Sequence, residues 1–253
     1  MEEIMLFGKI PIYGVCYYLG ILVSVVLGLF LAKKQKAHLF DFACCGIYTM
    51  IGAIIGAKSL FILVSIRKII ELQLGFIEIM KGGFVFYGGL LGGAFGAWLF
   101  GKQFHLPVKG YLDIFALVLP LGHAIGRIGC FFAGCCYGIE YEGACSVVYT
   151  SSNTAFTPLG VPLLPIQLIE SACLLCVFAV LLFLYCRKER KEGVIACVYL
   201  LAYGVLRFIM EFFRGDKERG VLLLSTSQWI SIGIIIAVLV MMWLKRRKRE
   251  IES

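Results

Sequence analysis

The sequence predicts an all-α integral membrane protein with seven transmembrane helices, its N-terminus outside and its C-terminus inside. Of the 253 residues, 60% are hydrophobic and 16% are charged, whereas a soluble domain carries about 25% charged residues. The apolar residues are grouped in long blocks, each close to the ~20 residues that cross a bilayer core. Because so little polar surface remains, a water-soluble helical bundle is a poor alternative.

The blocks predict a single transmembrane domain over residues 1–253. The start of the chain, MEEIMLFGKI, is acidic where a cleavable signal peptide has a basic region, so we expect the first span to be retained. The seven spans are expected at about 13–32, 40–64, 84–100, 114–132, 163–186, 194–213 and 221–244.

The orientation follows from the positive charges outside the spans. With the N-terminus outside, fourteen lysines and arginines fall on the inner side, five of them in the KRRKR tail at 245–249, and seven fall on the outer side. Since positive charge is retained inside, this distribution favours the N-out, C-in topology. The net charge of +8 therefore indicates contact with anionic lipid of the inner leaflet and no nucleic-acid partner.

Three further features lie between or within the spans. The longest loop, Ala133–Pro162, is on the outer side, and loops of that length are usually functional. The segment 65–83 alternates charged and apolar residues, which predicts an interfacial helix on the outer surface. In the third span, glycines recur at helical spacing, which suits close helix packing; alternatively, Gly82 and Gly83 form a turn whose free N–H groups face an anionic ligand.

Charged residues inside spans are costly and indicate a functional site. Lys58 can extend its long side chain so that its ammonium group reaches the membrane interface. Arg127 and Arg207 can either form structural ion pairs with Asp113 or Glu211 or bind a ligand. Arg207, Glu211 and Arg214 share one helix face at i, i+4 and i+7. A guanidinium group matches the geometry of a phosphate. We therefore expect arginines from separate helices to bind a phospholipid headgroup in the outer half of the membrane.

Eleven cysteines need a separate interpretation. Six lie in spans or near their inner ends and are typical small packing residues, whereas Cys130, Cys135, Cys136 and Cys145 gather toward the outer face. The C-x4-C-C spacing argues against a zinc or iron–sulfur site, so no metal is expected. Disulfide formation, plain packing and direct catalytic use all remain open for this group.

Six blocks of the sequence resemble, in the same order, those of one family of membrane enzymes, the prolipoprotein diacylglyceryl transferases. The resemblance covers nearly the whole chain, and six blocks in order are specific although any one is weak. The blocks are IYGVCYYLG (12–20), GGFVFYGGLLGG (82–93), PLGHAIGRIGCFFAGCCYG (120–138), LPIQLIES (164–171), RFIMEFFRGD (207–216) and LSTSQWISI (224–232).

The resemblance implies a transferase of the bacterial inner membrane that needs no cofactor. Such an enzyme moves a diacylglyceryl group from phosphatidylglycerol to the lipobox cysteine of an exported prolipoprotein, and glycerol phosphate leaves. The expected partners are phosphatidylglycerol, the signal-peptide segment of the precursor and membrane lipid. Matched by position, the expected catalytic residues are Arg127, Arg207, Tyr87, His123 and Cys135, and the expected substrate-binding residues are Tyr13, Gly88, Gly89, Gly126, Cys130, Gly138, Glu211 and Arg214.

The chain also departs from the family pattern. Tyr87 stands where the family has a histidine, Cys130 and Ala133 stand where it has asparagines, and Cys135 stands where it has a glutamate. A general base must accept the proton of the acceptor thiol, and three choices stay open: His123, a thiolate among Cys130 and Cys135, or no side-chain base. Two other functions also stay open, namely a membrane thiol-redox or sulfur-handling protein and a phospholipid-binding protein without catalysis.

Overall fold

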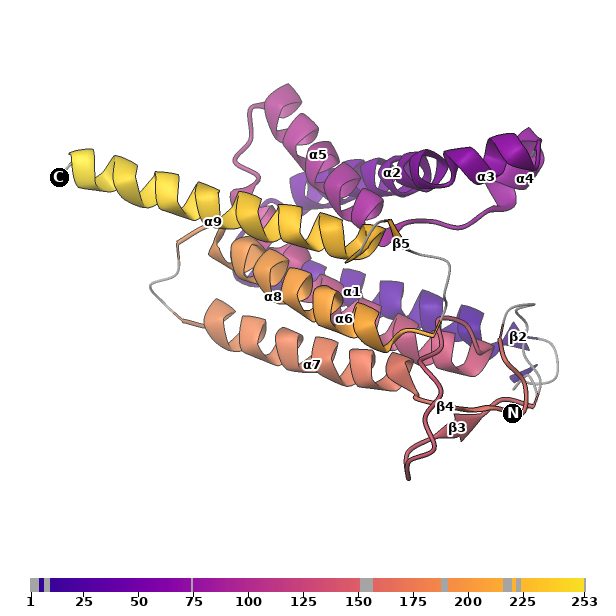
Figure 1. The fold of residues 1–253 in the computed structure, drawn as a ribbon. Coiled ribbons are helices and arrows are strands. Elements are labelled where there is room, and N and C mark those ends of the chain that lie inside the picture. Colours follow the sequence, from indigo (N-terminus) through magenta and orange to yellow (C-terminus); the bar gives the residue numbers. More distant parts are fainter. Residues whose placement is uncertain are drawn as a thin grey trace. The chain divides into compact units, whose positions relative to one another are not determined.

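A computed structural model describes residues 5–6, 10–73, 75–150, 157–187, 191–215, 220–221 and 224–252. It divides the chain into two compact units, one of residues 1–28 with 115–253 and the other of residues 29–114 (Figure 1). The division falls within α1 (Ile12–Lys34) and α6 (Lys109–Ala133). Residues 151–156 of the predicted outer loop, and Asp216 in the RFIMEFFRGD block, lie outside the described residues.

The expectation of a helical membrane protein is confirmed in the described part of the chain. Six helices there are long and apolar enough to cross a bilayer. They are α1, α2 (Leu39–Val64), α6, α7 (Ile166–Tyr185), α8 with the short η1 (Val194–Phe213) and the first part of α9 (Thr226–Glu252). A further helix, α5 (Phe86–Phe104), occupies the predicted third span but is not among the six.

In the unit of residues 29–114, α2 and α5 pack with their backbones almost in contact. A Cβ added to Gly88 would lie 2.3 Å from the carbonyl oxygen of Gly56, and one added to Gly92 would lie 2.2 Å from that of Gly52. Glycine is the residue that permits such an approach. The interpretation of these glycines as packing residues is therefore confirmed.

The alternative role, with free N–H groups facing an anion, is wrong for Gly82. Its N–H group donates to the carbonyl oxygen of Glu78 at 3.0 Å, so it is not free for an anion. The carbonyl oxygens of this turn instead bind a cation, since Lys58 Nζ donates to Met80 O at 3.1 Å and to Gly82 O at 3.0 Å. Lys58 thus ties α2 to the chain that precedes α5.

The predicted interfacial helix is broken into two. Residues 66–71 form α3 (Ile66–Glu71) and residues 76–81 form α4 (Phe76–Lys81). Between them Gln73 has φ +48°, a left-handed conformation that an α-helix does not contain. Large apolar side chains of both helices are exposed, including Ile70 and Phe76, which retains the amphipathic character that the sequence predicts.

In the other unit, α6 packs against the first part of α1. A Cβ on Gly20 would lie 2.7 Å from the carbonyl oxygen of Gly122, and Ser24 Oγ donates to Val118 O at 3.3 Å. Helix α8 packs against both α7 and α9. The described part of this unit also contains three two-stranded antiparallel sheets: β1 (Met5–Leu6) with β2 (Ile10–Pro11), β3 (Val147–Val148) with β4 (Pro162–Leu163), and β5 (Gly220–Val221) with β6 (Leu224–Ser225).

The last helix begins five residues later than the sequence analysis expected. Ser225 precedes α9, its Oγ accepting from the N–H of Gln228 at 3.2 Å, while Gln228 Oε1 accepts from the N–H of Ser225 at 2.9 Å. This reciprocal pair is a capping box, so the helix starts at Thr226 and not at Val221.

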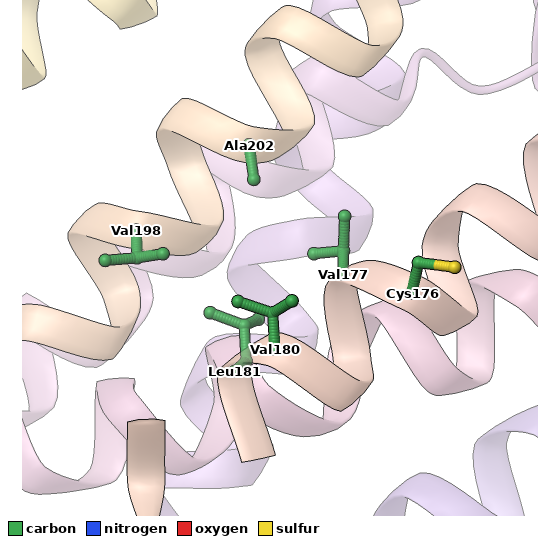
Figure 2. Close-up of a pocket in the computed structure, with 6 residues that line it drawn as sticks. All are labelled: Cys176, Val177, Val180, Leu181, Val198 and Ala202. Carbon is green, nitrogen blue, oxygen red and sulfur yellow. The ribbon is translucent and has the colours of Figure 1, made fainter. Parts of the chain in front are cut away.

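A shallow apolar groove of about 200 Å³ lies between α7 and α8 (Figure 2). Its lining carries no charged side chain and consists of Cys176, Val177, Val180, Leu181, Val198 and Ala202. Such a surface suits a lipid chain and offers no group for catalysis.

Candidate functional site

The end of α6 brings two cysteines together. The N–H of Cys135 donates to the carbonyl oxygen of Cys130, and the N–H of Gly134 donates to that of Phe131, both at 3.2 Å. Gly134 has φ +73°. These features define a Schellman motif, in which the residue two places after the helix contacts a residue of its last turn. Cys130 and Cys135 occupy those two positions.

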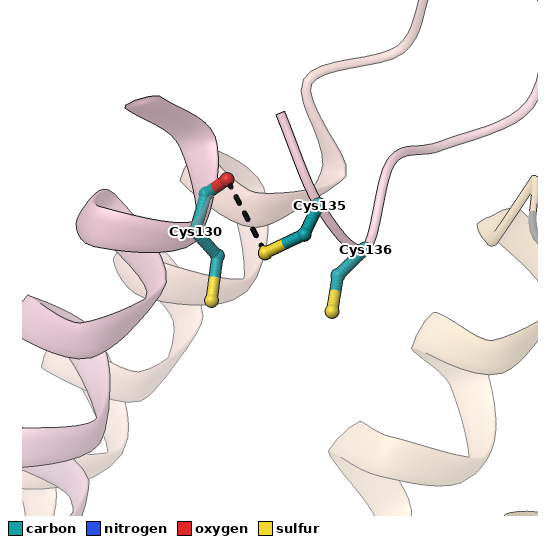
Figure 3. Close-up of side chains that lie close together, drawn as sticks. All are labelled: Cys130, Cys135 and Cys136. Atoms are coloured by element: carbon teal, nitrogen blue, oxygen red, sulfur yellow. Dashed lines mark hydrogen bonds between the residues drawn. The ribbon is translucent and has the colours of Figure 1, made fainter. Parts of the chain in front are cut away.

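The third thiol joins them because the next residue also turns in the left-handed sense. Cys136 has φ +57°, an uncommon conformation for a residue with a side chain. The Sγ atoms of Cys130, Cys135 and Cys136 all lie within 4.8 Å of one another (Figure 3). Cys135 Sγ also donates to the carbonyl oxygen of Cys130 at 3.7 Å. All three side chains are free thiols and are partly exposed; we call them the thiol cluster.

The thiols differ in acidity. The pKa of Cys136 is lowered, chiefly by hydrogen bonds from Cys130 and Cys135 and further by the positive charges of Arg214 and Arg127. The pKa of Cys135 is raised because hydrogen bonding with Cys130 and Cys136 stabilises its protonated form and because the thiol is partly removed from water. The positive charges of Arg214 and Arg127 therefore favour a thiolate at Cys136.

Carbonyl groups in the last turn of α6 and just after it are bound by three side chains. Thr157 Oγ1 donates to Gly134 O at 2.7 Å, Gln167 Nε2 donates to Cys135 O at 2.8 Å, and Tyr149 Oη donates to Phe131 O at 3.1 Å. Burial in this apolar surrounding raises the pKa of Tyr149 to about 12, so its hydroxyl stays a donor. These bonds hold the backbone of the thiol cluster in place.

Backbone contacts connect this loop to the segments beside α7 and α8. Gly138 pairs with Arg214, the N–H of Ile139 donates to Phe213 O at 3.0 Å, and the N–H of Leu164 donates to Ile139 O at 2.9 Å. A Cβ on Gly138 would lie 2.4 Å from Leu164 O. Glycine at position 138 therefore permits this close approach of the two backbones. The pairing of Gly138 with Arg214 places Arg214 next to the loop.

The two intramembrane arginines are each paired with a carboxylate. Arg127 Nη2 lies 3.0 Å from Glu170 Oε1 on α7, and Arg207 Nη2 on α8 binds Oε2 of Glu211, the first residue of η1. The pairing of Arg207 with Glu211 that the spacing permits is confirmed. Both pairs are buried, and the carboxylates lower the cost of placing the guanidinium groups there.

Both guanidinium groups keep donors for a further ligand. Within the described part of the chain, Arg127 Nε and Arg207 Nη1 have no hydrogen-bond partner. His123, one turn before Arg127 and 5.7 Å from the ring of Tyr203, lies within electrostatic range of both arginines. Arg127 and Arg207 therefore belong to one polar region between α6 and α8.

Two further predicted residues lie beside this region. Tyr13 begins α1, is 44% exposed, and lies within electrostatic range of all three thiols. Gly126 precedes Arg127, and an added Cβ there would meet nothing within 4 Å. Tyr87, Gly88 and Gly89, by contrast, lie on α5 in the unit of residues 29–114, where Tyr87 is buried and Gly88 packs on α2.

Comparison with known proteins decides the family. The model of the prolipoprotein diacylglyceryl transferases matches residues 3–244. A phosphatidylglycerol–prolipoprotein diacylglyceryl transferase of Clostridium tetani is 41% identical over 241 residues, covering 91% of this chain and 92% of the relative. The chain belongs to the prolipoprotein diacylglyceryl transferase family.

Further relatives carry the same name. Phosphatidylglycerol–prolipoprotein diacylglyceryl transferase 2 of Clostridium perfringens is 34% identical over 98% of this chain and 96% of its own length. Another, from Dehalococcoides mccartyi, is 31% identical over 95% of this chain and 91% of its own length. These matches confirm the resemblance that the six blocks indicate, and with it the class of transferase.

Sequence reasoning missed three residues of this family member's polar region. Glu170 and Gln167 stand in the LPIQLIES block, and a carboxylate in an otherwise apolar span is itself a signal of a buried partner. Cys136 was grouped with the outer-face cysteines but not among the expected site residues. Its contribution depends on a positive φ that the sequence does not reveal.

Proposed function

We propose that Arg127 and Arg207 jointly hold the phosphate of phosphatidylglycerol while the diacylglyceryl group passes to a cysteine of a prolipoprotein. The observation that supports this most is that both guanidinium groups are buried and lie within electrostatic range of the same side chain, His123. Each also has an N–H group without a hydrogen-bond partner in the described part of the chain. The enzyme is a transferase, and its donor and acceptor classes are those that its relatives' names state.

The roles follow from where charge develops. When the acceptor sulfur attacks the glyceryl carbon, the bond from that carbon to the phosphate oxygen breaks and negative charge grows on the departing glycerol phosphate. Positioned guanidinium groups stabilise that charge more than they stabilise the intact lipid, which is what lowers the barrier. Glu170 and Glu211 hold the two arginines in position. Arg214, nearer the outer surface, recruits the anionic headgroup.

The proposed enzyme is a single functional domain of seven spans, with α5 as the third, in the N-out and C-in orientation. The thiol cluster, the loop from Gly134 to Tyr149 and Arg214 then all lie on the outer side. Phosphatidylglycerol enters from the bilayer, and the lipobox cysteine of the precursor arrives at the outer surface. Tyr13, Gly126 and Gly138 line the approach, whereas Gly88 and Gly89 act within the other unit.

The experiment uses purified protein in phosphatidylglycerol vesicles with a lipobox peptide and follows both lipidated peptide and glycerol phosphate. We expect Arg127→Ala and Arg207→Ala to abolish both products. We expect Arg207→Lys to lose most of the activity because lysine cannot donate two parallel hydrogen bonds to a phosphate as a guanidinium group does. Arg246→Ala, in the exposed part of α9, is the matched control. Equal products from all variants would contradict the proposal. Thiol-disulfide exchange without lipid transfer would instead favour the redox alternative.

A further inference from the structure

We propose that Cys130, Cys135 and Cys136 form a trithiolate site for a zinc-like divalent cation, and that its open fourth position binds the acceptor's cysteine sulfur. The second half of this inference rests on the proposed transferase reaction. The first half stands on the geometry of the thiol cluster alone.

The three sulfur atoms already lie near the spacing of metal ligands. In a tetrahedral zinc–thiolate site the metal–sulfur distance is about 2.3 Å, which places the sulfurs about 3.8 Å apart. Here they lie within 4.8 Å of one another, and all three point into the same space (Figure 3). Small rotations of the side chains close the difference, while the backbone stays as it is.

The backbone geometry is what brings the ligands together. The Schellman motif puts Cys130 and Cys135 on one side, and the positive φ of Cys136 returns its side chain to them. Gln167 fixes the carbonyl group of Cys135. The C-x4-C-C spacing argued against a metal site because it does not match the ligand spacing of the usual zinc and iron–sulfur sites. The left-handed turn at Cys136 removes that objection.

The surrounding charges also fit an occupied site. Three thiolates and one divalent cation carry a net charge of −1, and a fourth thiolate would make it −2. Arg127 and Arg214 both lie within electrostatic range of Cys136. Arg214 therefore offsets part of the charge of the complete four-sulfur complex, and Arg127, which also compensates Glu170, contributes further. Three protein ligands with a fourth position left open is the arrangement of catalytic zinc sites.

An open coordination position on the metal supplies what the reaction needs, namely deprotonation of the acceptor thiol. A thiol that coordinates zinc loses its proton, which here passes to water, and becomes the nucleophile without a side-chain base. Its sulfur then forms a bond to the glyceryl carbon as the bond from carbon to phosphate oxygen breaks. The electron pair of that bond leaves with glycerol phosphate. The thioether product, now neutral, binds the cation weakly and is released.

The test begins with metal binding by the reduced, full-length protein in detergent. Titration with Cd²⁺ or Co²⁺ should give a thiolate charge-transfer band that saturates at one metal per chain. Cys130→Ser, Cys135→Ser and Cys136→Ser should each lose this band, with the folded state checked by thermal unfolding. Cys145→Ser and Cys176→Ser, which change exposed thiols outside the cluster, should keep it. No band in the wild type, or an equal loss in the two controls, would overturn the site.

The fourth position is tested with the Co²⁺-loaded protein. A lipobox peptide should shift the visible bands of the metal from three-sulfur to four-sulfur coordination, and the same peptide with serine for cysteine should not. Finding a disulfide within the cluster of the active enzyme would also refute the inference.

Activity separates this inference from the proposed function. If the metal-depleted protein or Cys136→Ser still transfers lipid at the wild-type rate, the inferred role of the metal in activating the acceptor fails and the transferase stands. If Cd²⁺ and peptide bind as expected but phosphatidylglycerol is never consumed, the metal site stands and the proposed function fails. Restoration of transfer by Zn²⁺ in the depleted wild type, but not in Cys136→Ser, supports both.

Discussion

Arg127 Nη2 on α6 lies 3.0 Å from Glu170 Oε1 on α7, and the next residue of α7, Ser171, donates to Ala124 O on α6 at 2.9 Å. The ion pair and the hydroxyl bond are thus adjacent, and together they position one helix of the polar region against the other. Glu170 is 2% exposed, so its charge depends on Arg127 for compensation. The pair is a structural contact and, under the proposed function, also holds the guanidinium group that binds the phosphate.

Replacing Glu170 with glutamine should separate these two roles. We expect the variant to lose about 3–5 kcal/mol of unfolding free energy, because a buried guanidinium group is left without its counter-charge. Adding Arg127→Gln should regain part of that stability, since no buried charge then remains, but should not regain lipid transfer. Thermal unfolding and transfer assays of the two single variants and the double variant form the cycle. Additive losses of stability would show that the pair is not coupled.

Gly126 and Gly129 offer a matched comparison on α6. A Cβ at Gly126 meets nothing within 4 Å, whereas one at Gly129 lies 2.9 Å from the Cβ of Cys16. We expect Gly126→Ala to keep or raise stability, by up to about 1 kcal/mol from helix propensity, but to raise the KM for phosphatidylglycerol if lipid occupies that space. Gly129→Ala should cost about 1–3 kcal/mol from overpacking. Unchanged transfer kinetics in Gly126→Ala would argue against lipid contact there.

Gly134 should control the thiol cluster without touching a thiol. Its φ of +73° costs a residue with a side chain about 1–2 kcal/mol, so Gly134→Ala should loosen the Schellman motif and lower the yield of a Cys130–Cys135 crosslink by a short bis-maleimide. Gly134→Asn should be milder, because asparagine tolerates this conformation. Mass spectrometry of the crosslinked peptides measures the effect. A crosslinking yield that is the same in both variants would contradict the role of Gly134.

The glycines of α5 also divide into two classes. Gly88→Ala should destabilise the packing of α2 on α5, because its Cβ would lie 2.3 Å from a backbone oxygen, while the Cβ of Gly89→Ala has its nearest neighbour at an ordinary 3.5 Å. We therefore expect only Gly88→Ala to lower the unfolding temperature. Lost transfer in Gly89→Ala at normal stability would support its expected substrate contact, and normal transfer would remove Gly89 from the site.

The fold was predictable from composition and periodicity to a large extent, because apolar blocks of span length leave few alternatives. The positions at which helices are interrupted or begin were not predictable in this way. The interfacial segment divides at Gln73 and α9 starts at Thr226, and both depend on local backbone conformation and capping. The SxxQ spacing of the capping box at Ser225 was nevertheless visible in the sequence.

The site was predictable only where the spacing along one helix sets the contact. The i, i+4 spacing predicts the pair of Arg207 with Glu211, since the helix itself sets their distance. The partner of Arg127 lies 43 positions away in sequence on another helix, and no spacing rule reaches that far. The three thiols are close in sequence, yet their convergence depends on two left-handed residues, Gly134 and Cys136. Only the glycine is a sequence signal of such a turn.

Whether α5 crosses the membrane can be decided by testing whether Cys145 lies on the same side of the membrane as the N-terminus. In the seven-span topology, four spans separate the N-terminus from Cys145, so both lie outside; with six spans, α5 does not cross and they lie on opposite sides. Cys145 and Cys186 are both exposed; Cys145 lies in the loop between α6 and α7, and Cys186 directly follows α7. An impermeant maleimide applied to intact cells should label Cys145 and an engineered Glu2→Cys but spare Cys186, which should react only after permeabilisation. Labelling of Glu2→Cys without Cys145 would remove α5 from the spans, and with it the proposed outer position of the thiol cluster.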